Sequence, residues 1–256
     1  MGSGPQGSGD QLRPDNESER LATVRRYDVL DTPPDGAFDR ITALAARLFD
    51  VPISIISIVD HDRIWFKSHY GLDATEIGRD PGLCASAICQ LDPWLVNDAQ
   101  VDVRTIDNPL VAGELGLRFY FGVPLTTTDG FNLGTLNVID VKPREVTEAE
   151  AETLKDLAAV VVDELEVRLA VRTKLEERRQ RALELNDDVV QGLALAQLAL
   201  QAGREEQAEA AIESTLRAAQ GIVGELLESA GDQGRLVPGD LVRETAASVL
   251  PSGASA

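Results

Sequence analysis

A helical pattern without a strong breaker runs from Glu148 to Gly203, and this stretch constrains the fold more than any other part of the sequence. A continuous helix of about 55 residues would be about 80 Å long. Because a single helix of that length is not stable in water without a partner, we expect a parallel coiled-coil dimer. Its apolar residues recur three and four positions apart, as on one helix face: Leu154, Leu157, Val161, Leu165, Leu169, Leu175, Ala182, Leu185, Val189, Leu193, Ala196 and Leu200.

A second helix is predicted over residues 205–230, because Gly203 ends the first one. Its apolar side chains also recur at helical spacing, for example at Ala208, Ile212, Ala219 and Val223. We expect the two helices to form an antiparallel hairpin. Two such hairpins would make a dimeric four-helix bundle.

The residues before the long helix predict an α+β domain. Helices are expected over 18–30, 36–49 and 83–90, and strands over 52–59, 63–70, 94–97, 117–126 and 132–141. Thr147 and Glu150 form a capping box at the start of the long helix. Helices flanking antiparallel strands define the α+β class, with a central antiparallel sheet.

The formal net charge of −19 argues against nucleic acid or an anionic membrane surface as the main partner. No apolar run reaches the roughly 18 residues of a membrane span, and no signal peptide begins the chain. Cys84 and Cys89 have neither disulfide-framework nor metal-site spacing, and His61 and His69 have no companion ligand. We therefore expect a cytoplasmic protein without membrane insertion, with no metal and no evident cofactor.

Five segments of the first half form a recognisable set: Leu30-Asp-Thr-Pro-Pro, Asp62-Arg-Ile-Trp-Phe-Lys-Ser, Asn108-Pro-Leu-Val, Gly122-Val-Pro-Leu and Leu133-Gly-Thr-Leu-Asn-Val-Ile-Asp. Together they resemble a bacterial GAF domain over roughly residues 18–170. The resemblance implies a sensory module with a pocket between the sheet and its crossing loops, and leaves the ligand unknown. Cys84, Phe119 and Phe121 are candidates for this pocket, although ordinary core packing also explains them; the Cys84 thiol is either a buried small hydrophobe or a redox or ligand-attachment group.

The motif Glu184-Leu-Asn-Asp-x-x-x-Gln-x-Leu193 resembles the first helix of the dimerisation and phosphotransfer hairpin of histidine kinases of the nitrate/nitrite-sensor type. Asn186 stands where that family has its phospho-accepting His. A carboxamide nitrogen is a poor nucleophile because its lone pair is delocalised into the carbonyl. With no ATP-binding domain after the hairpin, the resemblance implies a pseudo-kinase rather than an autonomous histidine kinase.

Five segments are expected: a disordered tail (1–17), a GAF sensory domain (18–145), a coiled-coil signalling helix (146–180), a pseudo-phosphotransfer hairpin (181–230) and a flexible C-terminal tail (231–256). One function that fits is a homodimeric two-component sensor or scaffold that docks a response regulator or a true sensor kinase. The alternative is an enzyme, a response-regulator phosphatase. In the related family, Asp187 and Gln191 correspond to residues associated with placing a water in line with the aspartyl phosphate.

Overall fold

The computed structural model describes residues 13–230. The chain divides into two compact units, with the boundary between Ala170 and Val171. The first unit contains a six-stranded antiparallel sheet with helices on both faces. The second unit contains a helical hairpin. One helix, α5 (Glu148–Gln201), contributes residues to both units.

The sheet has the strand order β3-β2-β1-β6-β5-β4, and every neighbouring pair is antiparallel. The strands are β1 (Ile53–Val59), β2 (Arg63–Tyr70), β3 (Glu76–Gly78), β4 (Trp94–Val96), β5 (Phe119–Thr126) and β6 (Asn132–Asp140). The central strands β1 and β6 are buried on both faces, which explains why they read as nearly continuous apolar runs. The expected strands are confirmed with slightly narrower ends, and β3 is an additional short edge strand.

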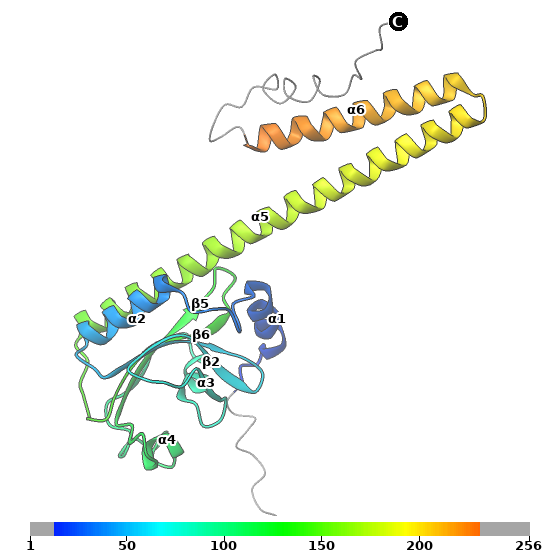
Figure 1. Cartoon of the computed structure of the whole chain (residues 1–256). Coiled ribbons are helices and arrows are strands. Elements are labelled where there is room, and N and C mark those ends of the chain that lie inside the picture. Colours follow the sequence, from blue (N-terminus) through cyan, green and yellow to red (C-terminus); the bar gives the residue numbers. More distant parts are fainter. Residues whose placement is uncertain (1–12, 231–256) are drawn as a thin grey trace, which may run out of the picture. The chain divides into compact units, whose positions relative to one another are not determined.

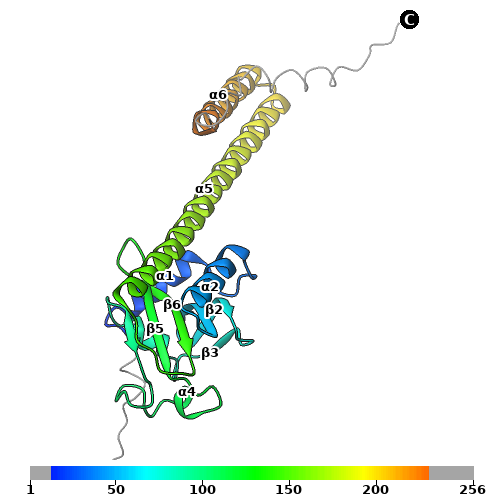
Figure 2. The ribbon, with the colours of Figure 1, turned by 90° about the vertical axis from the view of Figure 1, so that its left-hand side faces the viewer.

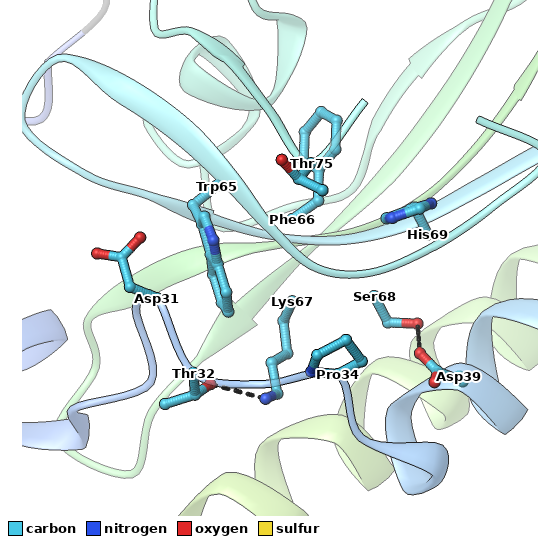
Figure 3. Close-up of a pocket in the computed structure, with 10 residues that line it drawn as sticks. All are labelled: Asp31, Thr32, Pro34, Asp39, Trp65, Phe66, Lys67, Ser68, His69 and Thr75. Carbon is cyan, nitrogen blue, oxygen red and sulfur yellow. Dashed lines mark hydrogen bonds between the residues drawn. The ribbon is translucent and has the colours of Figure 1, made fainter. Parts of the chain in front are cut away.

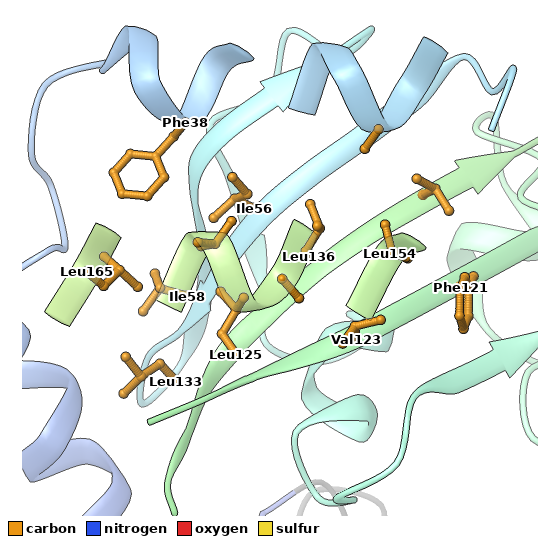
Figure 4. Packing of buried hydrophobic residues seen from close by; sticks show 14 of the residues in the cluster. Phe38, Ile56, Ile58, Phe121, Val123, Leu125, Leu133, Leu136, Leu154 and Leu165 are labelled. Carbon is orange, nitrogen blue, oxygen red and sulfur yellow. The ribbon is translucent and has the colours of Figure 1, made fainter. Parts of the chain in front are cut away.

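One face of the sheet is covered by α1 (Glu17–Tyr27), α2 (Gly36–Leu48) and the first part of α5. In Figures 1 and 2, α2 and the beginning of α5 run side by side across this face. Figure 4 shows how side chains from the helices and strands meet there. This proximal core includes Phe38, Ile56, Ile58, Phe121, Val123, Leu125, Leu133, Leu136, Leu154 and Leu165.

The opposite face carries a second core beneath α3 (Leu83–Ala87) and α4 (Pro109–Ala112). Because successive side chains of a strand point to opposite faces, alternate residues of each strand serve the two cores. This distal core includes Ile53, Ile55, Phe66, Leu83, Cys84, Trp94, Tyr120 and Ile139.

The start of α5 belongs to the first unit. Thr147 caps it as predicted: the Thr147 backbone N–H donates to Glu150 Oε2 at 2.8 Å and the Glu150 N–H donates to Thr147 Oγ1 at 3.3 Å. Leu154, Val161 and Leu165 are at most 3% exposed and complete the proximal core. The expected domain end at residue 145 was therefore too early, because the apolar stripe that follows is needed to cover the sheet.

The second unit is a hairpin of the rest of α5 and α6 (Glu205–Ala230), whose bounds agree with the prediction. Gly203 links the two helices with a φ of +69°, a conformation that glycine adopts without steric cost. The helices meet through small side chains: Ala196 and Ala208 are 3% and 1% exposed. Leu193 and Leu200, which the periodicity placed on the inner face, are instead exposed.

The expected tail and the start of the first helix need one correction. Glu17, assigned to the disordered tail, is the first residue of α1 and forms ion pairs with Arg20 and Arg79. The other residues that bear on the tail assignments, 1–12 and 231–256, lie outside the described part of the chain.

Candidate functional site

The first candidate site is an apolar cavity of about 200 Å³ between the distal face of the sheet and the segments that cross it. Strands β1, β2, β5 and β6 supply its floor, and α3, β3, the β2–β3 connection and residues 110–117 supply its walls. The lining residues are Ile53, Ile55, Phe66, Leu72, Ala74, Ile77, Leu83, Cys84, Leu110, Leu115, Leu117, Tyr120 and Ile139. We call this space the distal cavity.

Cys84 is the polarisable group of the distal cavity and is 5% exposed. Two buried donors point at its sulfur: Tyr120 Oη at 3.5 Å and Asn137 Nδ2 at 3.4 Å. Burial raises the pKa of Tyr120 well above its usual value, and the neighbouring Cys84 raises it further, so the phenol stays protonated. Asn137 Nδ2 also donates to Thr135 Oγ1 at 3.0 Å, whereas Asn137 Oδ1 is buried with no hydrogen-bond partner among the described residues.

The predicted grouping of Cys84 with Phe119 and Phe121 does not occur. Cys84 lines the distal cavity, but both phenylalanines belong to the proximal core on the other face of the sheet. The physical reason is the period of two along β5, which turns Tyr120 toward the cavity and its two neighbours away from it. Tyr120 is the pocket residue that the sequence analysis missed.

A second, more open cavity of about 530 Å³ lies beside β2 and the α1–α2 connection (Figure 3). A bulge at Lys67 shifts the β1–β2 register here. The Lys67 ammonium donates to Thr32 Oγ1 at 2.7 Å and to the Pro33 carbonyl at 2.9 Å, and it lies 5.5 Å from the ring centre of Phe38. Burial lowers the pKa of Lys67.

The carboxylates of this second cavity are also occupied by protein groups. Asp39 accepts a hydrogen bond of 2.7 Å from Ser68 Oγ, and Asp31 forms a salt bridge of 2.6 Å with Arg63. Because the polar groups satisfy one another, the second cavity is held together as part of the fold and offers less to a ligand than its size suggests.

Two polar contacts fix α5 where it leaves the first unit. Tyr27 Oη donates to Glu166 Oε1 at 2.6 Å, and Arg168 forms a salt bridge of 2.6 Å with Asp35, the residue that caps α2. The hydrogen bond from Arg168 and the one from the Ala37 backbone N–H hold the pKa of Asp35 at about 2. The Arg168 guanidinium also lies 4.6 Å from the ring centre of Phe38.

The hairpin carries the other predicted site. Asn186, Asp187 and Gln191 are all exposed on α5 in the second unit. Asp187 and Gln191 are one helical turn apart, so their side chains can reach one bound group together. Asn186 and Asp187 both lie three or four positions, about one helical turn, from the exposed apolar residues Leu183 and Val190.

The cysteines and the other potential metal ligands do not form a further site among the described residues. Cys84 and Cys89 are free thiols, and burial raises the pKa of Cys89. Within residues 13–230 no group of three or more His, Cys, Asp or Glu side chains is arranged to hold a metal ion. The helices in the same range include none with the length and apolarity needed to cross a membrane.

Comparisons with known proteins bear on the first unit. A relative named cyclic di-GMP phosphodiesterase PA2567, from Pseudomonas aeruginosa, is 41% identical over 150 residues, which is 58% of this chain. The chain spans about a quarter of that relative's length, 26%.

Solved structures with similar folds have lower identities. The GAF domain from an Acinetobacter phosphoenolpyruvate-protein phosphotransferase is 18% identical, with a TM-score of 0.46, over 61% of this chain and 96% of that one. Free methionine-R-sulfoxide reductase from Neisseria meningitidis is 20% identical, with a TM-score of 0.45, over 67% of this chain and 99% of that one.

The GAF domain family matches residues 33–165, which is just over half of the chain. The matched range begins just before α2 and ends at Leu165, the last buried α5 residue of the proximal core. The end of the matched range therefore coincides with the end of the α5 segment that covers the sheet. The chain belongs to the GAF domain family.

Proposed function

We propose that this protein is a cytoplasmic signalling homodimer in which the GAF domain binds a small molecule and the hairpin docks a response regulator or a true sensor kinase. The name of the relative, cyclic di-GMP phosphodiesterase, is that of a signalling protein, and this supports a signalling role for the domain the two proteins share. The observation that carries the proposal is the set of large apolar side chains that the hairpin exposes mostly on one side.

The seam between α5 and α6 is made of small residues. A Cβ built on Gly192 would lie 1.8 Å from Thr215 Oγ1, so the two helices approach as closely as glycine allows. Such a seam uses few of the hairpin's large apolar side chains. The larger ones therefore point outward and need another partner.

Most of these outward residues lie on one side of the hairpin, whereas Leu195 and Leu198 lie on the other side of α5. At about 3.6 residues per turn, the apolar stripes of α5 and α6 are displaced from the seam in the same rotational sense about their own helix axes. Because the helices are antiparallel, this brings both stripes to the same side. The residues are Leu183, Val190, Leu193 and Leu200 on α5 and Ile212, Leu216 and Val223 on α6, all exposed within one chain. We call this side the apolar face.

A second copy of the hairpin fits the apolar face, because packing two such faces buries both stripes in a four-helix bundle. Gln191 lies on the side of α5 opposite Leu193 and Leu200, so we expect it to stay accessible in the dimer. Asp187 lies one helical turn from Leu183 and Val190, at the edge of the apolar face. An incoming response regulator would meet this acidic and amide pair. Asn186 can donate a hydrogen bond to a phosphoryl oxygen but cannot take up a phosphoryl group.

Sedimentation equilibrium of the full chain tests the dimer. We expect a dimer at micromolar concentration, and a monomer for the double variant Leu193→Asp with Leu216→Asp, because four charges would be buried per dimer. The matched control is Leu198→Asp, an exposed leucine of α5 on the side away from the apolar face. It should remain a dimer. A monomeric parent protein, or a control that dissociates as readily as the double variant, would refute this interface.

The exposure of Asp187 and Gln191 favours a second function, dephosphorylation of a response regulator. Hydrolysis of an aspartyl phosphate needs a well-placed water more than it needs covalent catalysis. The assay follows phosphate release from a purified phosphorylated regulator in the presence of the full chain. Gln191→Ala should slow release at least tenfold, whereas Gln197→Ala, an exposed glutamine two turns away, should not. Equal rates for the parent and Gln191→Ala would eliminate the phosphatase.

A further inference from the structure

Lys67 in the second cavity carries a buried charge without an opposite charge beside it. The residue is 5% exposed, and its ammonium forms no salt bridge among the described residues. Its two hydrogen-bond acceptors, Thr32 Oγ1 and the Pro33 carbonyl, are both uncharged. Asp35 is close enough to influence the pKa of Lys67, but its carboxylate is engaged by Arg168 at 2.6 Å. Since buried charges in proteins are normally paired, Lys67 is a candidate for binding an anion.

Aromatic rings stabilise the Lys67 charge only in part. The ammonium nitrogen lies 5.5 Å from the ring centre of Phe38 and 5.8 Å from that of Trp65. The Arg168 guanidinium lies 4.6 Å from the same Phe38 ring, so a second cation shares it. The face of an aromatic ring attracts a cation but has no net charge. Burial therefore remains the largest influence on Lys67 and lowers its pKa.

Lys67 is also the exception to the mutual satisfaction of polar groups in the second cavity. An ammonium has three N–H donors, and two of them are used by Thr32 and Pro33. In Figure 3 the Lys67 side chain extends from β2 toward the α1–α2 connection, beside the Trp65 ring. Both residues line the cavity, which has a volume of about 530 Å³. A ligand in this cavity can therefore receive the third N–H of Lys67 and face its positive charge.

The neighbouring groups restrict the anion to a small one with a single charge. Asp31 and Asp39 also line the cavity, so their carboxylates repel a ligand with two or more negative charges. One N–H donor matches one carboxylate oxygen, whereas a phosphate brings three strong acceptor oxygens. Trp65, Phe66 and Pro34 supply apolar surface for a ring or a short hydrocarbon chain. These features together favour a carboxylate with an apolar body.

We propose that the second cavity binds a small monocarboxylate with an apolar body, whose carboxylate accepts a hydrogen bond from the Lys67 ammonium. This site is separate from the distal cavity, because the two sets of described lining residues have only Phe66 in common. The inference rests on the proposed sensory role of the first unit and adds a chemical class of ligand to it.

Benzoate and benzamide form a matched pair of probes. They have the same ring and nearly the same shape, and both offer an oxygen acceptor, but only benzoate carries a negative charge. Because charge-assisted hydrogen bonds are stronger than neutral ones, we expect benzoate to bind the full chain with a dissociation constant at least about tenfold lower than that of benzamide. In Lys67→Met, which removes the charge and keeps a long side chain, the two constants should become equal. Ligand-observed NMR titration in a phosphate-free buffer of low ionic strength measures all four constants.

Control variants separate the second cavity from a general attraction of anions. Lys142→Met removes an exposed lysine of the first unit and should leave the benzoate constant unchanged. Thr75→Trp adds bulk to the cavity wall while Lys67 is kept, and it should weaken benzoate at least about tenfold. It therefore decides the outcome even if Lys67→Met does not fold. Its own control is Thr173→Trp, on an exposed part of α5.

Several results would overturn the proposal. They are absence of benzoate binding at millimolar concentration, equal constants for the two probes in the parent chain, and unchanged benzoate binding by Thr75→Trp or by a folded Lys67→Met. Tighter binding of inorganic phosphate than of benzoate would overturn the carboxylate class. None of these results bears on the oligomeric state of the hairpin or on the phosphate-release assay, so failure of this ligand class is distinguishable from failure of the signalling role.

Discussion

Replacement of Glu17 by Gln tests whether the first residue of α1 anchors the GAF domain. The Glu17 carboxylate pairs with Arg20 at 2.7 Å and with Arg79, and these two arginines are 1% and 5% exposed. Arg20 Nη1 also donates a hydrogen bond to the Asn132 carbonyl oxygen of β6 at 3.3 Å. Arg79 Nη1 donates one to the Asp60 carbonyl oxygen at 2.9 Å. The carboxylate thus neutralises two buried cations that join α1 to the sheet.

The size of the effect follows from the pKa of Glu17. Burial alone raises this pKa, but the hydrogen bonds from Arg20 and Arg79 outweigh burial and lower it from 4.5 to about 2. A shift of this size corresponds to about 3 kcal/mol of folding free energy, and the Glu17 side chain is only 13% exposed, so solvent screening reduces it little. The pKa is depressed on folding, so the contribution is full above about pH 4.5 and is lost as the pH falls toward 2.

We therefore expect Glu17→Gln to lower the free energy of unfolding by about 3 kcal/mol at pH 7. At pH 3 the difference from the parent should shrink to less than half. Urea unfolding followed by tryptophan fluorescence reports the GAF domain selectively, because Trp65 and Trp94 both lie in the first unit. The control is Glu19→Gln, an exposed neighbour in the same helical turn. A loss below about 1 kcal/mol at pH 7, or a difference that does not change between pH 7 and pH 3, would refute this reasoning.

Three other substitutions have defined outcomes. Gly134→Ala places a Cβ 1.8 Å from the Ser57 carbonyl oxygen in the centre of the sheet. The free energy of unfolding, measured by thermal unfolding, should therefore fall by about 1–3 kcal/mol. Gly192→Val would collide with Thr215 across the hairpin seam, so the sedimentation dimer should weaken while the tryptophan unfolding midpoint stays unchanged. Asn186→His should accept phosphate from a complete histidine-kinase catalytic domain supplied in trans, and the parent should not; labelling of both proteins would mean that another residue is the acceptor.

The sequence predicted well those elements of the fold that depend on local signals. The capping box at Thr147, strand β2 and helix α6 agree with expectation, because each depends on local signals: a cap, an alternating run and a 3.6-residue period. The GAF resemblance also agrees with the family match. The homodimer, the coiled coil and the kinase-like role of the hairpin remain predictions.

What the sequence did not predict depends on contacts between distant segments. Periodicity could not show that Leu193 would be exposed, because the seam is selected by where Gly192 meets Thr215. Alternation along β5 separated Tyr120 from Phe119, but nothing local indicated which face would hold the cavity. The three residues of β3 are too few for any period to be recognised.

The sharing of α5 between the two units has a practical consequence for protein engineering. A chain cut at residue 145 would leave Phe38, Ile56 and Leu136 open to water, since the side chains of Leu154 and Leu165 that cover this core lie beyond the cut. Chimeras that exchange this sensor for another should therefore be joined after residue 170, so that the donor domain keeps the helix that closes it.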